Sequence, residues 1–465
     1  MRNIVNPYAD VNFASTPKVP ANSHEHIYNG GTFQHVYRRG VRAFACVNYF
    51  PSAPSVAPAG KLGLTQDANF SSWRIPVEDW IDPKDIPTEV QNNAFNMSLS
   101  ELSQYKTTRY YQGSYPTITD GQGNTVQTAG VPQIANMEFA FLPWVRGNIS
   151  DRISQHFNVL GNLFSIPTNG MDYHAIYEGM TWDEEKVWRA QHPLYSMEEL
   201  MSYVTNSAYQ QFEGKIFGTA NHNYDVNGLK KYFDRYPQVF KAMECFNQGY
   251  SRSTNNAFRN AYDTLLKQGY RIWGTSVVDW NGSREVAGGL MPDERAEWVA
   301  AYNVLTPEEQ AQYGSWQNYY ETTAVKECGD RDRGCNVLYI PDYDSILARS
   351  PKEAAEAALD AYIAGRYYMS GFAGYSITGL DVTDYSVTLS ISGNAESLRG
   401  VTNNNVVTSS GNTITVPIDK KTSYVRFEAY FSDADFLFTN PIFVEQEQTD
   451  NKKELFNRCF TLGIV

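Results

Sequence analysis

The sequence predicts an α/β fold, a barrel of strands and helices followed by a small C-terminal all-β sandwich. Two observations support this prediction. From about residue 20 to 368, apolar β-rich runs alternate with segments whose apolar residues recur at helical spacing. Such alternation is typical of a parallel α/β sheet. After about residue 370 the period changes to two, which is typical of strands separated by short turns.

The predicted strands of the barrel include four apolar runs: "VRAFACV" (41–47), "KIFGTAN" (215–221), "QVFKAM" (238–243) and "YRIWGTSVV" (270–278). Between the last two, "NNAFRNAYDTLLKQG" (255–269) has helical spacing and ends in a glycine, which favours helix termination. A further helix is predicted over 350–366, where Ser350 can cap the first turn and Pro351 suits its first position. This number of alternating strands and helices predicts a barrel or a distorted barrel.

The predicted domains are a barrel over residues 1–370, a β-sandwich over 371–447 and a tail over 448–465. Two segments interrupt the alternation of the barrel. Residues 51–130 are rich in Pro, Ser, Gln and Asn, and residues 282–345 are polar and acidic. We expect both to form loops over one face of the barrel, where binding specificity usually resides. Within the first, "TDGQGNT" (119–125) indicates a hairpin turn.

Composition limits the classes of function. The 465 residues are 42% hydrophobic and 14% aromatic, so most of the chain is expected to be globular with more than one core. A net charge of −13 argues against binding to nucleic acid or membrane surfaces, which relies on a cationic field. No 18-residue apolar run and no signal-peptide core are present. We therefore expect a soluble protein, cytoplasmic by default, although the sequence leaves open a removed leader.

Ionisable side chains recur where the apolar runs end. These residues are Glu138 after "VPQIANM", His222 after "KIFGTAN", Glu244 after "QVFKAM" and Asp279 after "YRIWGTSVV". The carboxyl ends of parallel barrel strands converge on one rim, where active sites are built. If His24 and His26 follow a first short strand, they join the same rim. Mixed nitrogen and oxygen ligands suit Zn, Mn or Fe.

Each of these residues also has a simpler structural interpretation. An H-x-H pair is common by chance, and a histidine that ends a strand, such as His222, is more often a hydrogen-bonded loop residue. Each of the three acids could cap a following helix. On a strand, however, alternation points His24 and His26 to one face, which permits chelation. The repetition of the arrangement at four strand ends favours a metal site.

The order of the motifs resembles the PHP (polymerase and histidinol phosphatase) superfamily. The motifs are the H-x-H pair, the strand-ending Glu138, "HFNVLG" (156–161), "ANHN" (220–223), "MECFN" (243–247) and "SVVDWN" (276–281). The chain is most similar to the metal-dependent phosphoesterase-like branch, which carries a C-terminal β-sandwich. "AALDAYIAGRYYMSG" (357–371) and "FTNPIFV" (438–444) resemble the C-terminal region of that branch.

The resemblance implies a distorted (β/α)7 TIM-like barrel with a metal centre at its strand ends. The ligands carried over by position are His24, His26, Glu138, His156, His222, Asp279 and, at a frequently acidic position, Glu244. The first two histidines would bind one ion with the aspartate nearby. Glu138 would bridge to a second ion, and His156 and His222 would complete the site of that ion.

Two motifs depart from the family pattern. Where the family shows Asp-His after the strand "GVRAFACV", this sequence has Asn48 and Tyr49. The closing D-x-H reads "DWN" (279–281), and an amide oxygen coordinates only weakly. We therefore expect one or two divalent ions (Zn, Mn or Fe) and not a full trinuclear centre. The general base is unassigned. Metal-bound water would be the nucleophile, and Asn281 and Arg146 are the candidate catalytic side chains.

The leading prediction is a PHP-like metal-dependent hydrolase that acts on a small-molecule phosphate ester. Arg38, Arg39 or Arg146 could hold the phosphate, or could form surface salt bridges. An amidohydrolase is an alternative, because that class also begins with H-x-H, although it typically needs a bridging lysine. A degenerate barrel that serves as a binding or structural module is a third interpretation, and the missing family histidines favour it.

Overall fold

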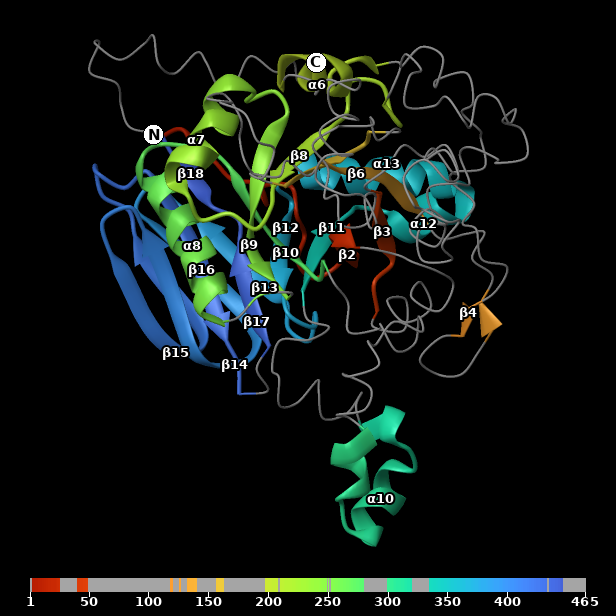
Figure 1. The fold of residues 1–465 in the computed structure, drawn as a ribbon. Helices are drawn as coiled ribbons and strands as arrows, with labels where there is room; N and C mark the ends of the chain where they lie inside the picture. The colour runs from red at the N-terminus through yellow and green to blue at the C-terminus, as the bar shows by residue number, and fades with distance from the viewer. Residues whose placement is uncertain are drawn as a thin grey trace, which may run out of the picture.

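The computed structural model describes residues 2–25, 40–48, 118–119, 125–126, 132–139, 156–162, 197–207, 210–248, 250, 252–279, 299–319, 334–432 and 435–445. Within these residues, one sheet of 16 strands forms the framework of the molecule (Figure 1). Among the helices of the described residues, none is long and apolar enough to cross a membrane.

The first part of the sheet carries the candidate site. Its strands lie side by side in the order β2 (Lys18–Glu25), β3 (Ala43–Asn48), β6 (Gln133–Phe139), β7 (Phe157–Leu160), β8 (Phe217–Ala220), β9 (Phe240–Asn247) and β10 (Trp273–Val277). β7 is antiparallel to both neighbours, and the other pairs in this series are parallel. The sheet curls, because a parallel bridge joins Asp279, just after β10, to Glu25 in β2.

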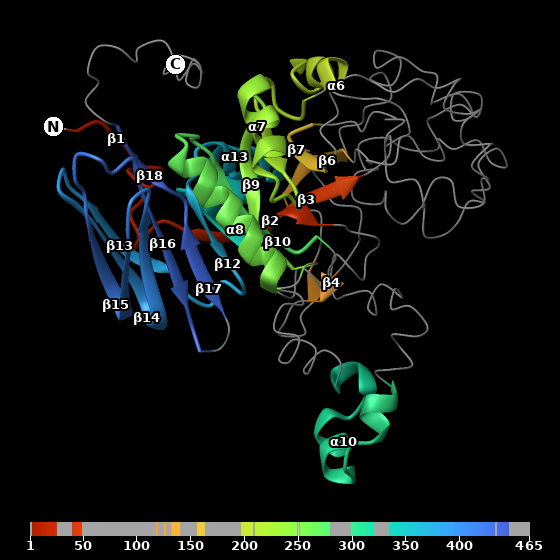
Figure 2. The same ribbon diagram turned by 60° about the vertical axis from the view of Figure 1, so that its left-hand side comes forward.

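The same sheet continues on the other side of β2. The strands there are β11 (Cys335–Tyr339), β12 (Tyr367–Ser370), β17 (Phe436–Thr439), β16 (Tyr424–Tyr430), β18 (Ile442–Val444) and β1 (Ile4–Val5), with β13 (Ile377–Val382), β14 (Ser386–Thr402) and β15 (Val406–Pro417) attached to β16 through β14. β11 is antiparallel to both β2 and β12. Figure 2 shows β13 to β18, in blue, beside the first part of the sheet.

The described helices connect or cover the strands. They are α6 (Met197–Val204), α7 (Val226–Arg235), α8 (Arg252–Lys267), α10 (Pro307–Tyr313), α12 (Tyr343–Arg349) and α13 (Pro351–Ile363). The helix expected over 350–366 is confirmed as α13, where the Ser350 side chain accepts from the Glu353 amide and Pro351 occupies the first turn. Gly365 follows it with φ +69°, and a Cβ there would lie 2.5 Å from the Trp273 ring. Only glycine fits this turn.

The prediction of a distorted (β/α)7 TIM-like barrel is wrong. Such a barrel has parallel strands throughout, with a helix after each strand. The described structure is instead strand-rich, with antiparallel pairs on both sides of β7 and along the whole C-terminal part of one continuous curled sheet. Strands and helices do alternate along the described chain from β7 to β12. Among the described segments, however, only β8–α7–β9 and β9–α8–β10 join neighbouring parallel strands, whereas the pairs β7–β8 and β11–β12 are antiparallel.

Several individual elements lie where the sequence predicted them. β3, β8, β9, β10 and α8 fall on the expected runs, and β4 (Ile118–Thr119) pairs with β5 (Thr125–Val126) around the expected hairpin turn. β11, in contrast, is a fully buried strand inside the segment 282–345 that was expected to form loops. The strands expected in a sandwich do form, but they hydrogen-bond into the main sheet through β12 and β17.

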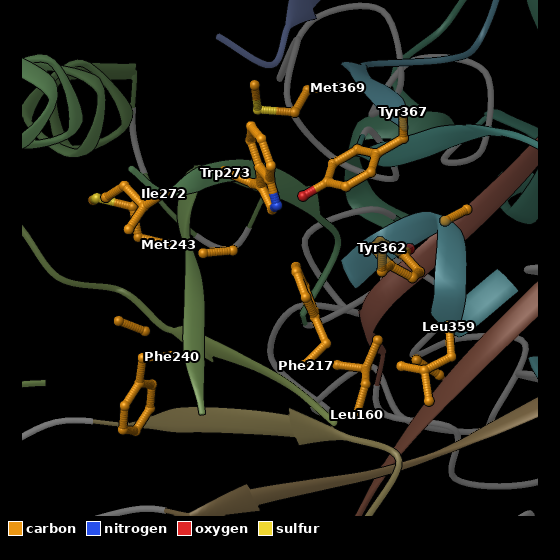
Figure 3. Packing of buried hydrophobic residues seen from close by; sticks show 14 of the residues in the cluster. Leu160, Phe217, Phe240, Met243, Ile272, Trp273, Leu359, Tyr362, Tyr367 and Met369 are labelled. Atoms are coloured by element: carbon orange, nitrogen blue, oxygen red, sulfur yellow. The ribbon is translucent and has the colours of Figure 1, made fainter. Parts of the chain in front are cut away.

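Two hydrophobic clusters support the sheet. The first contains Phe217, Phe240 and Leu359 (Figure 3). It packs α7, α8 and α13 against the first part of the sheet. The second lies among the C-terminal strands and contains Leu389 and Phe427. Burial of such side chains contributes about 1.5–3 kcal/mol each, so these clusters are the main source of stability.

A buried ion-pair network joins α8 to β16. The guanidinium of Arg426 lies 2.6 Å from Asp263 Oδ1 in α8 and 2.7 Å from Glu428 Oε1. Arg399 approaches the other oxygen of Glu428 at 2.6 Å. Burial acts to raise the pKa of Glu428, but the charges of Arg426 and Arg399 outweigh it and hold the pKa below its usual range. The network therefore anchors α8 on the C-terminal strands.

Replacing Arg426 tests this anchor. Arg426→Ala leaves Glu428 without its buried partner and should lower the free energy of unfolding by about 3–5 kcal/mol. Urea denaturation followed by circular dichroism measures the change. The matched control is Arg349→Ala, which removes an exposed pair with Glu353 and should change stability little. Equal effects of the two substitutions would contradict a stabilising network.

The lowered pKa of Glu428 also predicts a pH dependence. A carboxyl group whose folded pKa lies below its unfolded value of about 4.3 stabilises the fold above that pH and loses this contribution as the pH falls through the folded pKa. As the pH is lowered from 5, the urea concentration at the unfolding midpoint should therefore fall more steeply for the wild type than for Glu428→Gln. The contradicting result is the same pH dependence in both proteins.

Candidate metal centre

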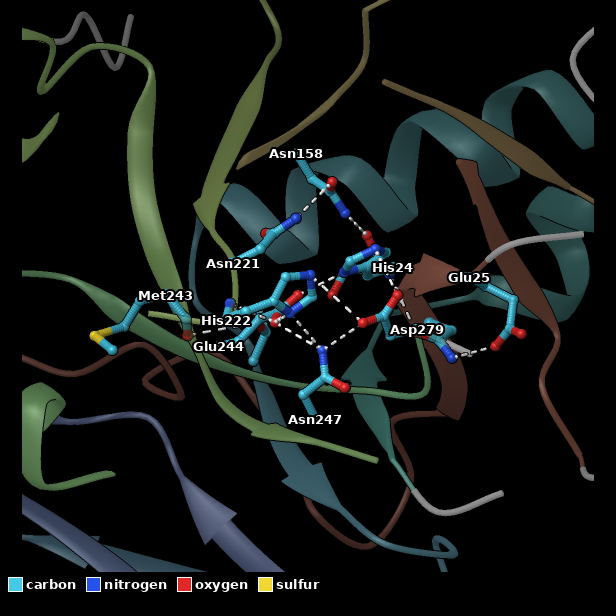
Figure 4. Close-up of polar contacts among 12 residues, drawn as sticks. His24, Glu25, Asn158, Asn221, His222, Met243, Glu244, Asn247 and Asp279 are labelled. Carbon is cyan, nitrogen blue, oxygen red and sulfur yellow. Dashed lines mark hydrogen bonds and ion pairs between the residues drawn. The ribbon is translucent and has the colours of Figure 1, made fainter. Parts of the chain in front are cut away.

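Four side chains from separate elements meet at one end of the curled sheet (Figure 4). His24 lies near the end of β2, His222 just after β8, Glu244 within β9 and Asp279 just after β10. His24, Glu244 and Asp279 are buried, and His222 is the most accessible of the four, with 11% of its side chain exposed against 1% for His24 and 6% for Asp279. The curl of the sheet is therefore what brings these distant segments together.

Irregularities in two strands aim the side chains into the cluster. Glu244 pairs with Thr275, but the next pair is Phe246 with Ser276, so β9 contains an extra residue. In a regular strand, residues three apart face opposite sides of the sheet. The bulge lets Glu244 and Asn247 face the same side. The pairing of β2 with β3 is likewise irregular between Asn22 and Glu25, where His24 lies.

Two of the four residues have a strained backbone. His222 has φ 45° and Asp279 has φ 59°, in the left-handed region that costs a non-glycine residue about 1–2 kcal/mol. Hydrogen bonds from neighbouring segments hold both conformations. The His222 amide donates to Glu244 Oε2 at 3.1 Å, and the Asp279 amide donates to the His24 carbonyl at 3.0 Å. Such strain persists where the surrounding structure imposes it, which is common at functional sites.

The carboxylate of Glu244 lies between the two imidazoles. Its Oε1 is 2.6 Å from His24 Nδ1, and its Oε2 is 3.0 Å from His222 Nδ1. Burial acts to raise the pKa of Glu244, but His222 and His24 outweigh it and lower the pKa to about 2. An ionised carboxylate can only accept hydrogen bonds, so each Nδ1–H donates to it. This fixes the orientation of both rings.

The opposite side of each ring faces Asp279. His24 Nε2 lies 3.3 Å from Asp279 Oδ1, and His222 Nε2 lies 3.4 Å from Oδ2. Asn247 Nδ2 donates to Asp279 Oδ2 and to Glu244 Oε2, each at 3.0 Å. The Asn247 backbone is held in turn by the Asn255 side chain, with bonds of 2.7 and 3.0 Å. A single amide therefore orders both carboxylates.

This arrangement fits a divalent ion. Ligand atoms of His24, His222 and Asp279 all lie within 4.8 Å of one another. A tetrahedral ion with bonds of about 2.0–2.1 Å separates its ligand atoms by about 3.3–3.4 Å. The Nε2 atoms of His24 and His222 lie at such distances from the Asp279 carboxylate, each from a different oxygen. Two imidazoles and one carboxylate suit Zn, Mn or Fe. A dication also balances the charges of the two buried carboxylates while both imidazoles stay neutral, each with its single proton on Nδ1.

The structure brings together His24, His222, Glu244 and Asp279 of the predicted ligands. His156 lies directly before β7, and its ring is 5.3 Å from that of His222. Because β7 is antiparallel to β8, the start of β7 lies at the same end of the sheet as the end of β8. Glu138 lies in β6 opposite Asn158. The residues that fall outside the described ones are His26, Asn281, Arg146, Arg38 and Arg39.

Two details of the arrangement differ from the sequence prediction. His222 was expected in a second site, but its ring is 5.2 Å from that of His24, and both rings contact the same carboxylates. Glu244 was expected as a ligand at a strand end. It lies three residues before the end of β9 and contacts both Nδ1 atoms, so it positions the rings.

Sequence reasoning missed the asparagines around the cluster. Besides Asn247, Asn221 donates to Asn158 Oδ1 at 2.8 Å, and Asn158 donates to the Ser23 carbonyl at 3.4 Å. These bonds tie β2, β7 and β8 together beside the histidines. The motifs "MECFN", "ANHN" and "HFNVLG" contain all three asparagines, so an amide within three residues of Glu244, His222 and His156 was the available signal.

Comparison of the chain with protein-family models, with curated proteins and with solved structures gave no match. Membership of the PHP superfamily therefore stays a prediction from motif order. The case for a metal centre rests on the distances, burial and charge of His24, His222, Glu244 and Asp279.

Proposed function

We propose that the protein is a metal-dependent hydrolase of phosphate esters in which His24, His222 and Asp279 hold a divalent ion. The observation that carries the proposal is the convergence of two Nε2 atoms on the Asp279 carboxylate, while Glu244 contacts both Nδ1 atoms. A carboxylate behind each ligating histidine is the usual support of a protein metal site. The choice of phosphate esters rests on the order of the sequence motifs.

The residues of the chain have distinct tasks in this proposal. When bound, the ion supplies Lewis acidity, which activates water and polarises the phosphoryl oxygen. Glu244 keeps the protons of both rings on Nδ1, and this leaves the Nε2 lone pairs directed at the ion. Asn247 holds the Asp279 carboxylate in place through its bond of 3.0 Å. Burial of these groups keeps bulk water from screening their charges.

The substrate meets the cluster beside His222, whose side chain is more exposed than those of His24 and Asp279. His156 flanks this ring at 5.3 Å and lies outside the group of close ligand atoms. We assign His156 the proton transfer to the leaving oxygen, because an imidazole next to the ion can serve as a general acid. Its role is thus separable from metal binding.

The ligand assignment predicts which substitutions release the ion. Wild-type protein dialysed against Zn or Mn should retain about one ion per chain, as measured by elemental analysis. His24→Ala and His222→Ala should lose it, and Glu244→Gln should weaken binding about 10–100-fold, because it supports the ligands without binding the ion. His156→Ala is the matched control and should keep the ion. An equal loss in His156→Ala, or no ion in the wild type, would overturn the assignment.

Hydrolysis tests the reaction class. With Mn or Zn supplied, the protein should release nitrophenol from p-nitrophenyl phosphate or from bis-p-nitrophenyl phosphate. His24→Ala should abolish the activity. His156→Ala should lower kcat about 10²–10⁴-fold, the typical contribution of a general acid, while the ion stays bound. A protein that binds the ion but hydrolyses neither ester would contradict the hydrolase proposal and favour a binding or structural role.

A further inference from the structure

A strip of aromatic side chains leads from the surface to the candidate metal centre. We define the aromatic strip as Tyr224, Phe258 and Tyr250. The Tyr250 ring lies 5.2 Å from the His222 ring at an angle of 35°. Phe258 is 5.5 Å from Tyr250, and Tyr224 is 6.1 Å from Phe258. Phe258 is buried and Tyr224 is 60% exposed, so the strip opens to solvent at Tyr224.

The inner end of the strip is anchored to the residues that order the cluster. The Tyr250 amide donates to the Asn247 carbonyl at 3.2 Å, and Asn255 donates to the Tyr250 carbonyl at 3.0 Å. Asn255 also bonds both backbone groups of Asn247. Tyr224 lies only two residues after His222, ahead of α7. The position of the strip relative to the metal centre is therefore set by short, rigid connections.

The chemistry of the strip favours a planar apolar group. Aromatic rings attract other rings in tilted and edge-to-face arrangements, which contribute about 0.5–1.5 kcal/mol beyond the area that they bury. The exposed Tyr224 ring and the partly exposed Tyr250 ring provide such a surface, and the buried Phe258 packs against both. The net charge of −13 disfavours a polyanionic leaving group. A neutral ring avoids this repulsion.

We propose that the aromatic strip binds the leaving group of the substrate, and that the substrate is therefore an aryl phosphate ester and not an alkyl or polyanionic one. This inference rests on the proposed function, because the phosphoryl end of the ester has to bind at the metal centre. The strip then receives the ring on the accessible side of His222. Tyr224 contributes to specificity and takes no part in the chemistry.

Binding of three phosphonates to the zinc-loaded protein tests this inference without turnover. Isothermal titration calorimetry should give phenylphosphonate a Kd about 3- to 10-fold below that of methylphosphonate, with cyclohexylphosphonate weaker than phenylphosphonate, because stacking adds to apolar burial. Tyr224→Ala should remove the preference for the phenyl ring without changing the Kd of methylphosphonate. Tyr224→Phe should retain the preference.

The matched control is Tyr385→Ala, which removes another exposed tyrosine, from the turn between β13 and β14, and should leave every Kd unchanged. If the ion and methylphosphonate bind but the phenyl ring adds nothing, or if Tyr224→Ala keeps the preference, the strip has no role and the proposed function stands. If neither the ion nor any phosphonate binds, the proposed function fails and the inference fails with it.

Discussion

The carboxylate of Glu244, buried between two imidazoles, is the constraint on which the site depends. It contacts Nδ1 of both His24 and His222, and therefore both Nε2 atoms face Asp279. An ionised carboxylate in this position is costly to bury unless it is fully paired. The bulge in β9 and the left-handed backbone at His222 both serve to bring partners to it.

Helix α8 connects the stability of the fold with the geometry of the site. Near its start, Asn255 holds the backbone of Asn247, whose side chain bonds both carboxylates. Phe258, less than one turn later, forms the middle of the aromatic strip. Asp263 then pairs with the buried Arg426 of β16, and Figures 1 and 2 show the two elements side by side. Anchoring one helix therefore positions both the metal centre and the aromatic strip.

The sequence indicated which polar residues lie close together better than it predicted the fold. Polar residues after apolar runs identified His222 and Asp279, and capping residues identified α13, because both signals are local. Strand direction is not local. A run such as "FNVL" (157–160) reads the same in a parallel and an antiparallel strand, so the reversal of β7 could not be predicted. The bulge that turns Asn247 toward Glu244 also leaves no signal in the residue pattern.

The most direct test of the central claim is anomalous X-ray scattering from crystals of the zinc-loaded protein, recorded on both sides of the zinc absorption edge. The ligand assignment predicts one peak within about 2.0–2.2 Å of Nε2 of His24, Nε2 of His222 and a carboxylate oxygen of Asp279, with Glu244 still bonded to both Nδ1 atoms. A peak elsewhere, ligation through Nδ1 or direct ligation by Glu244 would contradict it.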